Sequence, residues 1–267
     1  SGHILYKGQD LTTWDARQMS GFRGKCCSIV FQDPMTSLNP VFTIGNQLRE
    51  AIELHTDRKG KASLARAIEM LELVGINEPQ KRVKQYPHEL SGGMRQRVMI
   101  AMALACEPDI LIADEPTTAL DVTIQAQILE LMQSLQKKMG MAVILVTHDL
   151  GVIADMCDNI IVMYGGHICE RGTADEIFYN PRHEYTKGLL RSIPNVNNMK
   201  EKLIPIAGTP INVLNLPKGC AFCARCDEAM KICLEEQPEE LTINDNHKAS
   251  CWMNVRRMLE EEGGGAQ

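Results

Sequence analysis

The chain has 267 residues and a formal net charge of −6, and 44% of its residues are hydrophobic and 23% charged. These values are ordinary for a globular protein, so we expect a sizeable buried core and exclude wholesale disorder. The acidic balance gives no electrostatic footprint for nucleic acid or for an anionic membrane surface, so a nucleic-acid partner is not expected.

No segment is expected to cross a membrane. The longest uninterrupted apolar stretch, residues 98–106, is about half of what a membrane-spanning helix needs. The first residues carry no basic region, no long apolar region and no initiator Met. They read like the interior of a longer protein.

Hydrophobic periodicity predicts strands and helices in alternation. The expected strands are short apolar runs, and the expected helices carry apolar residues three and four positions apart. In chain order they are a strand at 27–31, helices at 44–54, 64–74 and 92–106, a strand at 110–113, a helix at 122–139, strands at 142–146, 159–163 and 167–169, and short helices near 174 and 185. This order indicates an α/β fold with a parallel sheet, and the region of about 41–108 is expected to form a helical subdomain.

The composition changes near residue 193. Pro194, Pro205, Pro210 and Pro217 interrupt the chain from there on. We therefore expect one domain over residues 1–192 and a C-terminal extension over residues 193–267.

Two neighbouring acids follow the apolar run at 110–113. Asp114, at the end of a buried strand, is placed to hold Mg²⁺ directly or through water, because this hard cation prefers oxygen ligands. Glu115 is placed to polarise an attacking water. Taken alone, Asp-Glu-Pro equally fits a strand that ends in solvated acids.

Ser91, Gly92 and Gly93 precede the apolar helix at 92–106, with Ser91 as a suitable N-cap. A helix start of this kind presents backbone N–H groups to an anion, although such a segment is usually only a flexible cap. The sequence contains no G-x-x-x-x-G-K-[ST] phosphate loop. Residues 21–26 resemble one faintly, but the glycines are too close together and Cys26 offers no hydroxyl for Mg²⁺.

The chain has ten cysteines. Five lie in apolar patterns and are expected to be small buried hydrophobes: Cys26, Cys27, Cys106, Cys157 and Cys169. The other five follow residue 219: Cys220, Cys223, Cys226, Cys233 and Cys251. Without a secretion signal, a metal or cluster site is favoured over a disulfide framework there.

The order and spacing of these segments resemble the nucleotide-binding subunit of ABC transporters. Residues 90–96 resemble the signature motif, residues 110–115 the Walker B motif, residues 119–121 the D-loop, Gln32 the Q-loop glutamine and His148 the switch histidine. The resemblance implies a P-loop NTPase fold of ABC type, with helices on both faces of the parallel sheet. Two such subunits would sandwich ATP and Mg²⁺.

The resemblance also implies roles for individual residues. Glu115, His148 and Gln32 would be catalytic, and Asp114 and Gln32 would bind Mg²⁺. Ser91, Gly92, Gly93 and Asp121 would contact nucleotide, the first three reaching the γ-phosphate held by the opposite subunit.

The match narrows to the D-type ATPase of bacterial dipeptide and oligopeptide importers. Residues 31–40, residues 90–102 with Met94, and the tail segments 183–186, 208–210 and 216–220 all resemble that branch. This implies an F-type ATPase subunit as partner, two separate transmembrane permease subunits, and indirectly a solute-binding protein. It places the chain peripherally at the cytoplasmic face of the cell membrane, with peptides or a related solute such as nickel as cargo.

Cys220, Cys226, Cys233 and Cys251 match positions that hold an iron–sulfur cluster in some importers of this branch, and [4Fe–4S] requires four thiolates. Cys223 competes as a ligand. His247 adds an alternative in which the site holds zinc.

The absence of a phosphate loop from the sequence limits the interpretation of the chain as an ATPase. We expect the fold to be N-terminally truncated relative to the family and the chain to be inactive by itself as an ATPase. The alternative is a truncated, non-hydrolytic paralogue with a regulatory or metal-cluster-binding role.

Overall fold

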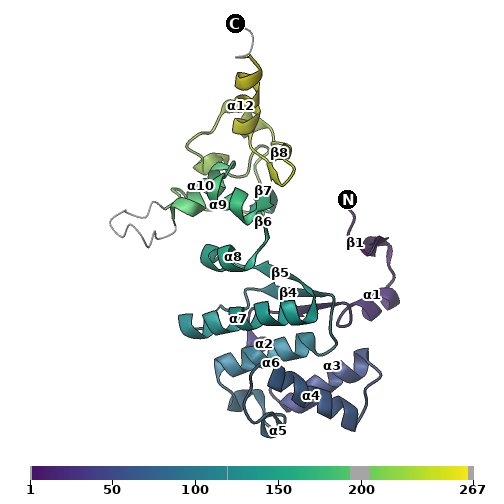
Figure 1. The fold of residues 1–267 in the computed structure, drawn as a ribbon. Helices are drawn as coiled ribbons and strands as arrows, with labels where there is room; N and C mark the ends of the chain where they lie inside the picture. Colours follow the sequence, from purple (N-terminus) through teal and green to yellow (C-terminus); the bar gives the residue numbers. More distant parts are fainter. Residues whose placement is uncertain (1, 119, 193–204, 264–267) are drawn as a thin grey trace. The chain divides into compact units, whose positions relative to one another are not determined.

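A computed structural model describes residues 2–118, 120–192 and 205–263 (Figure 1). The chain divides into two compact units, Ser1–His148 and Asp149–Gln267. The boundary expected near residue 193 does not coincide with this division. It falls at the start of residues 193–204, which lie outside the described residues, and it stays a prediction.

Unit 1 combines a small parallel sheet with a group of helices. Its strands are β1 (Leu5–Tyr6), β2 (Gln9–Asp10), β3 (Cys27–Val30), β4 (Ile110–Asp114) and β5 (Ala142–Val146). Its helices are α1 (Ala16–Phe22), α2 (Pro34–Ser37), α3 (Ile44–His55), α4 (Lys61–Leu73), α5 (Pro79–Arg82), α6 (Gly92–Leu104) and α7 (Val122–Met139), with 3-10 helices at Leu11–Thr13 and Pro87–Glu89.

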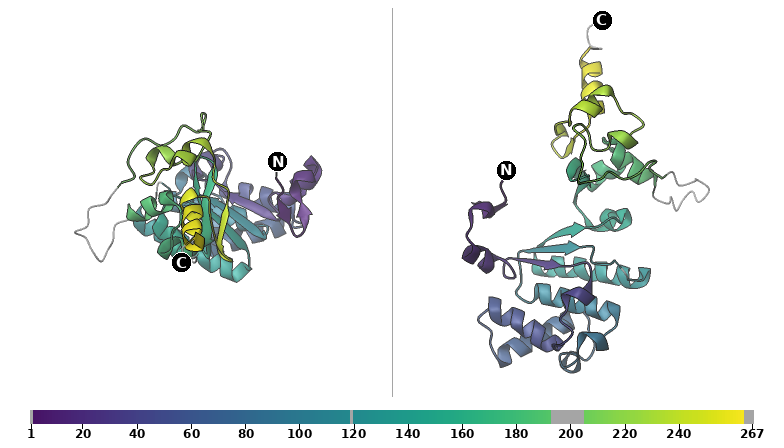
Figure 2. Two further views of the ribbon diagram at one scale, coloured as in Figure 1. Left: turned by 90° about the horizontal axis from the view of Figure 1, so that it is seen from above. Right: turned by 180° about the vertical axis from the view of Figure 1, so that it is seen from behind.

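The expected parallel sheet is formed by β3, β4 and β5, in that order. Its register pairs Ile112 with Ile29 of β3 and Ile144 of β5. Leu111 and Ala113, which point to the opposite face, are fully buried, and α6 and α7 lie on one side of the sheet (Figures 1 and 2). Ile29 and Ile144 are exposed, so among the described residues of this unit helices cover one face of the sheet.

The helices expected at about 41–108 pack together as a subdomain. Helices α3, α4 and α6 contact one another around fully buried side chains such as Leu48, Leu71 and Ile100. The apolar run at 64–74 that predicted α4 is not buried throughout, because Leu64 is exposed, and the charged Arg66 is buried. Arg66 is accommodated because its guanidinium forms ion pairs with two partly exposed glutamates at the rim, Glu69 and Glu107.

Unit 2 is built on an antiparallel sheet. Its strands are β6 (Asn159–Tyr164), β7 (His167–Thr173), β8 (Leu241–Asn244) and β9 (His247–Ala249). Its helices are α8 (Leu150–Met156), α9 (Ala174–Tyr179), α10 (Glu184–Arg191), α11 (Lys231–Glu235) and α12 (Trp252–Gly263), with a 3-10 helix at Cys223–Arg225. The strand order is β6-β7-β9-β8.

The strand expected at 159–163 is present as β6, but it pairs antiparallel with β7. Strand β7 then pairs with β9, so the tail hairpin β8–β9 completes the same sheet. The sequence did not predict the tail elements β8, β9, α11 and α12, since their short apolar runs have little periodicity of their own. Among the described residues, no helix is sufficiently long and apolar to span a membrane.

Candidate functional site

Three side chains converge on the carboxylate of Glu115 in unit 1. Oε1 lies 2.9 Å from Nδ1 of His148. Oε2 accepts hydrogen bonds of 2.8 Å from Nε2 of Gln32 and 2.9 Å from the hydroxyl of Thr118. Both carboxylate oxygens are therefore occupied by donors from the same chain.

The parallel sheet explains why these residues meet. Gln32, Glu115 and His148 follow the carboxyl ends of β3, β4 and β5, and the carboxyl ends of parallel strands lie at one edge of a sheet. Glu115 has a left-handed backbone with φ of 44°. Its N–H donates to the carbonyl of Val146 in β5, so the turn that aims the carboxylate is tied to the sheet although its conformation is strained.

The electrostatics of the carboxylate follow from its donors. The hydrogen bond from His148, and after it that from Thr118, lowers the pKa of Glu115 because both stabilise the charged form. The site is open, since the side chain of Glu115 is 25% exposed and that of His148 is 78% exposed. The donors can therefore move away without breaking a packed core.

Asp114 and Gln32 line a common cavity of about 590 Å³ together with residues of α2 and α6. A carboxylate and an amide oxygen are both hard ligands, and Mg²⁺ bound to phosphates usually takes only one or two protein oxygens. The donor set at this cavity therefore fits Mg²⁺ in its chemistry. Glu115 does not line the cavity but faces His148.

The expected signature residues form the start of α6. Ser91 is the N-cap, with its hydroxyl accepting from the N–H of Met94 at 3.3 Å. A Cβ on Gly93 would lie 2.9 Å from Cγ2 of Ile124 in α7, so a larger residue would have to displace the Ile124 side chain. Gly92 has more space, with its nearest neighbour atom, on Leu120, at 3.9 Å.

Asp121 lies next to this region as the N-cap of α7. Its carboxylate accepts from the N–H of Ile124 at 3.0 Å. The structure thus gives Asp121 a capping role and leaves its expected contact with nucleotide a prediction. Ala119 of the expected D-loop lies outside the described residues.

The tail cysteines gather around one small cavity in unit 2. All five of them line it, among other residues, and its volume is about 20 Å³. Burial raises the pKa of Cys220 to about 11 and that of Cys226 to about 12, and it also raises the pKa values of Cys223 and Cys251. All ten cysteines are free thiols.

The donor chemistry of this cavity fits a thiophilic metal group, but its geometry does not by itself support one. No group of three or more His, Cys, Asp or Glu side chains in the described part of the chain is arranged to hold a metal ion. The role considered for His247 was wrong: its two ring nitrogens face Glu170 at 2.7 Å and Glu176 at 3.1 Å. His247 is therefore engaged elsewhere and does not line the cysteine cavity.

The sequence reasoning missed two residues. Thr118 binds Glu115 through its hydroxyl, and the only signal for it was its place in the turn three residues after the acid. Cys169 was expected to be a small buried hydrophobe, and it is buried. However, it also packs with Cys220 and Cys226 around Phe222. The other four cysteines that were expected to be buried are only partly buried: Cys26, Cys27, Cys106 and Cys157.

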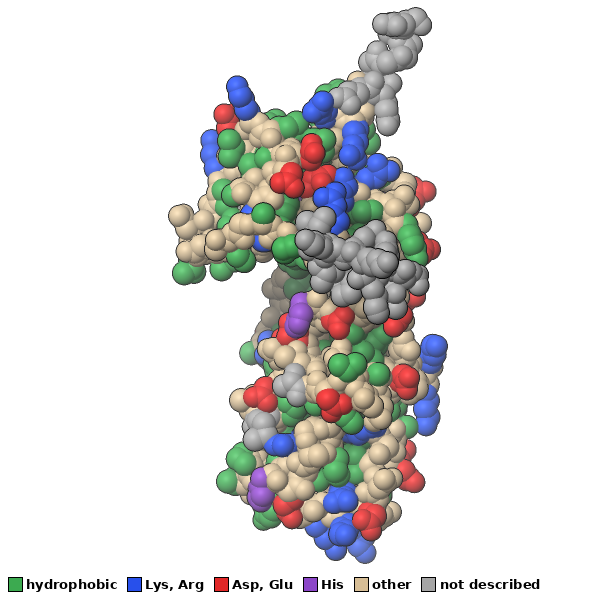
Figure 3. Space-filling model, turned by 90° about the vertical axis from the view of Figure 1, so that its left-hand side faces the viewer, with side chains coloured by type: hydrophobic (Ala, Val, Ile, Leu, Met, Phe, Trp, Pro, Cys, Tyr) green, Lys and Arg blue, Asp and Glu red, His purple; other side chains and the backbone are tan. Residues whose placement is uncertain are grey.

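Charged side chains of both signs lie on the described surface. On the face drawn in Figure 3, acidic and basic side chains are mixed in both units. An extended patch of one sign, which nucleic-acid binding would require, is not seen on that face among the described residues.

Comparisons with known proteins agree with the motifs. Residues 1–118 match the family described as ABC transporter, and residues 169–233 match the C-terminal region of oligopeptide/dipeptide transporters. The chain is 52% identical to the dipeptide transport ATP-binding protein DppD of Bacillus subtilis, over 96% of this chain and 76% of that protein. It is 54% identical to the oligopeptide transport ATP-binding protein OppD of the same organism, over 94% and 71%.

Solved structures show the same fold. The ATP-binding cassette MJ0796, in a dimeric post-hydrolysis state bound to ADP and Pi, has a TM-score of 0.58 at 28% identity, over 65% of this chain and 74% of that one. CbiO1 from Clostridium perfringens, part of the ABC transporter complex cbiONQ, has a TM-score of 0.59 at 28% identity, over 67% and 69%. With these matches and the motif residues in place, the chain belongs to the ATP-binding proteins of the oligopeptide/dipeptide ABC transporter family.

Proposed function

We propose that the chain is an ATP-hydrolysing subunit that energises import of dipeptides or oligopeptides, or of a related solute such as nickel. The observation that carries the proposal is the convergence of Gln32 and His148 on Glu115 at the carboxyl edge of a parallel sheet. The names of the relatives DppD and OppD support the peptide cargo.

The roles of the residues follow from what each can donate or accept. Asp114 and Gln32 offer the oxygens that would hold Mg²⁺, and Mg·ATP, when bound, supplies the phosphoryl group that water attacks. Glu115 would accept the proton of that water. In the structure three hydrogen bonds stabilise the charged form of its carboxylate, so the departure of a donor would make Glu115 a stronger base.

Gln32 and His148 are the donors able to leave. Gln32 also lines the Asp114 cavity, so a turn of its amide toward a cation there would leave Oε2 with the Thr118 hydroxyl as its remaining donor. His148 is mostly exposed, and its movement toward a phosphate would free Oε1. Binding of nucleotide would then convert a weakly basic carboxylate into the general base.

We propose that the subunit works with a second, F-type ATPase subunit and two transmembrane permease subunits, and indirectly with a solute-binding protein. This places it peripherally at the cytoplasmic face of the membrane. Ser91, Gly92 and Gly93 would contact the γ-phosphate held by the opposite subunit, and Asp121 would lie beside that contact. The helix start at Ser91 supports this role because its N–H groups favour an anion.

We propose that these 267 residues do not hydrolyse ATP by themselves, since they contain no phosphate loop. The test is ATPase activity of the purified chain beside its Glu115→Gln variant. Activity equal in both and at background supports the proposal, whereas turnover that disappears with Glu115→Gln contradicts it. The genomic sequence upstream of Ser1 distinguishes this from a non-hydrolytic regulatory paralogue: an in-frame phosphate loop supports the importer ATPase.

The catalytic role of Glu115 has a direct test in the assembled transporter. The chain, joined to any upstream segment its gene encodes, is reconstituted with its partner subunits, and ATP turnover is measured. Glu115→Gln is expected to lower turnover by about 10²-fold or more, within the range seen when a general base is removed. Asp109→Asn, which removes an acid at the opposite end of β4 from Glu115, is the matched control and should retain turnover.

We also propose that Cys220, Cys226, Cys233 and Cys251 bind a [4Fe–4S] cluster or, failing that, zinc, with Cys223 as the alternative ligand. The donor chemistry supports the proposal, since all five thiols line one cavity. A metal would have to displace the thiol protons that burial retains. Anaerobic purification followed by iron, sulfide and zinc analysis tests it, and a folded, colourless, metal-free chain contradicts it.

A further inference from the structure

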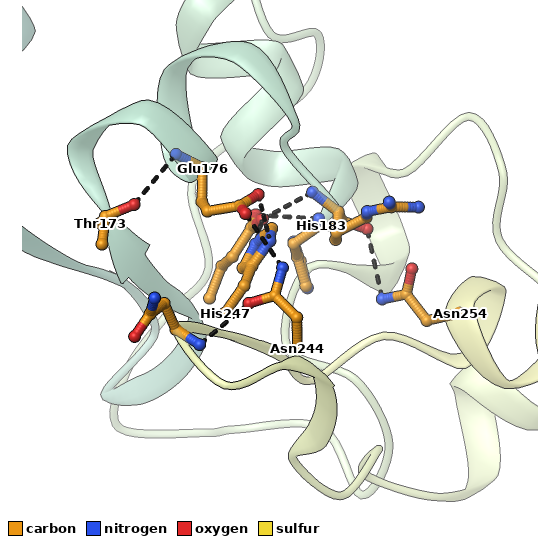
Figure 4. A network of polar contacts seen from close by, with 9 residues as sticks. Thr173, Glu176, His183, Asn244, His247 and Asn254 are labelled. Atoms are coloured by element: carbon orange, nitrogen blue, oxygen red, sulfur yellow. Dashed lines mark hydrogen bonds and ion pairs between the residues drawn. The ribbon is translucent and has the colours of Figure 1, made fainter.

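A buried network of polar side chains fastens the tail hairpin β8–β9 to the rest of unit 2 (Figure 4). Its centre is the ring of His247 in β9, with no exposed side-chain surface. Nε2 lies 2.7 Å from Oε1 of Glu170 in β7, and Nδ1 lies 3.1 Å from Oε2 of Glu176 in α9. The ring therefore bridges a strand and a helix that the hairpin packs against.

Glu170 is held in place by hydrogen bonds from the backbone. Its side chain is fully buried, and besides the His247 ring it accepts from the backbone N–H of Arg182 at 2.6 Å and of His183 at 2.9 Å. Glu176 is held more loosely: it is 23% exposed and accepts from the amide of Asn244 at 2.9 Å. Both carboxylates thus face the ring as acceptors.

This arrangement requires a doubly protonated ring. A carboxylate only accepts hydrogen bonds, and a neutral imidazole has a single N–H. If the ring lost one proton, a nitrogen lone pair would face a carboxylate oxygen, and a hydrogen bond would become a repulsion in a site that excludes water. The contact to Glu176 is the one that can yield, because this side chain reaches solvent and the contact is the longer of the two.

The other charged groups around the His247 ring do not replace Glu170 or Glu176 as its partners. Arg171 on β7 pairs with Glu240, and Lys248 is only partly buried beside His247. Asp175 of α9 is exposed. His183, the other imidazole nearby, accepts a hydrogen bond from the N–H of Tyr185, and burial lowers its pKa to about 4, so it stays neutral at physiological pH.

We propose that Glu170, His247 and Glu176 form an ionic latch that is closed only while the His247 ring carries two protons, and that loss of one of them releases the β8–β9 hairpin from α9. The latch is a pH-sensitive attachment of the tail and is independent of the proposed ATPase function. It acts on the same part of the chain that carries the cysteine cavity, since Cys251 follows β9 directly.

The experiment is amide hydrogen exchange of the full chain between pH 6 and pH 9, corrected for the intrinsic exchange rate. In the wild type, protection of residues 241–249 should fall about tenfold more than that of β4 in unit 1 as pH rises. Glu176→Gln should abolish this difference, because its amide can donate to the unprotonated nitrogen or accept from the protonated one. Asp175→Asn removes the same charge from the same turn without touching the ring, and should behave as wild type.

A second measurement tests the proposal on the wild type, so it does not depend on a variant that folds poorly. The ¹⁵N chemical shifts of the imidazole of His247 in the wild type report directly whether both nitrogens carry protons. Two protonated nitrogens at pH 6 and one at pH 9, with His183 neutral throughout, support the latch. A neutral His247 at pH 6, pH-independent protection of residues 241–249, or a Glu176→Gln variant that keeps the wild-type pH dependence would overturn it.

Discussion

Glu115 in unit 1 and Glu170 in unit 2 are both glutamates surrounded by three donors, one of them a histidine ring. The difference lies in what the donors are and how accessible they are. Glu115 accepts only from side chains, at a site where His148 is 78% exposed. Glu170 accepts from two backbone N–H groups and a ring, with no exposed surface on either side chain.

The carboxylate of Glu115 can change its hydrogen-bond partners, whereas that of Glu170 cannot. Side-chain donors at an open site can rotate away at the cost of one solvent-compensated hydrogen bond. Backbone donors in a buried site can leave only if the local fold opens. The same set of residue types therefore suits a reaction step in unit 1 and an attachment in unit 2.

The largest expected effect comes from Glu170→Gln. The introduced amide has one acceptor oxygen for three buried contacts, those to the Arg182 and His183 N–H groups and to the His247 ring, so the free energy of unfolding of unit 2 should fall by about 3 kcal/mol or more. Urea denaturation followed by Trp252 fluorescence measures it in a Trp14→Phe background, where Trp252 of unit 2 is the sole tryptophan.

Glu115→Gln is the matched variant in unit 1, and its unfolding is followed through Trp14 fluorescence in a Trp252→Phe background. Because this residue is partly exposed and its donors can turn to water, the free energy of unfolding of unit 1 should change much less than that of unit 2 does in Glu170→Gln. If the free energy of unfolding fell equally in the two variants, the Glu115 site would be as rigid as that of Glu170, and the difference drawn between them would be wrong.

Many helices and strands of unit 1 were predictable from the sequence, because residues within or next to each element determine its bounds. Helix α7 begins and ends where expected, because Asp121 caps its start and Gly140 takes the left-handed conformation at its end. The bounds of β5 are also confirmed. The meeting of Gln32, Glu115 and His148 follows from the parallel order of three strands, which the alternation of strands and helices indicated.

What could not be predicted depends on partners far away in the sequence. His247 looked like a metal ligand because nothing near it in the chain reveals Glu170 and Glu176, which are 77 and 71 residues away. The hairpin β8–β9 is short and forms only against β7. Thr118 binds Glu115 through a left-handed turn, and no residue pattern specifies that Glu115 adopts it.

The next effect in size concerns the acid–base behaviour of Glu115. Removal of its imidazole donor in His148→Ala should raise the pKa of Glu115 toward the ordinary value, because the hydrogen bond from His148 is the main cause of its lowering. In the wild type the stability linked to this group is present above the unfolded-state pKa and is lost as pH falls through the lower folded-state pKa. The variant should lose that acid-side contribution.

Carbon-13 NMR of the glutamate side-chain carboxyls measures this pKa, with the Glu115→Gln spectrum assigning the resonance. The Glu170 resonance serves as the internal control, since His148→Ala does not touch its donors. A titration of Glu115 that is identical with and without His148 would contradict the role given to that contact and would leave Gln32 and Thr118 to account for the geometry.

The smallest effect expected is that of Thr118→Val. This change keeps the backbone N–H that donates to the carbonyl of Glu115 at 3.2 Å but removes the hydroxyl that donates to Oε2. The pKa of Glu115 should rise, but less than in His148→Ala, because the Thr118 hydrogen bond is the second cause of its lowering. Thr118→Ser restores the hydroxyl and should restore the titration. If Thr118→Ser behaved like Thr118→Val, the presence of the hydroxyl would not be what sets the pKa of Glu115. The turn would then be held by the backbone alone, as the Glu170 site is held by the N–H groups of Arg182 and His183.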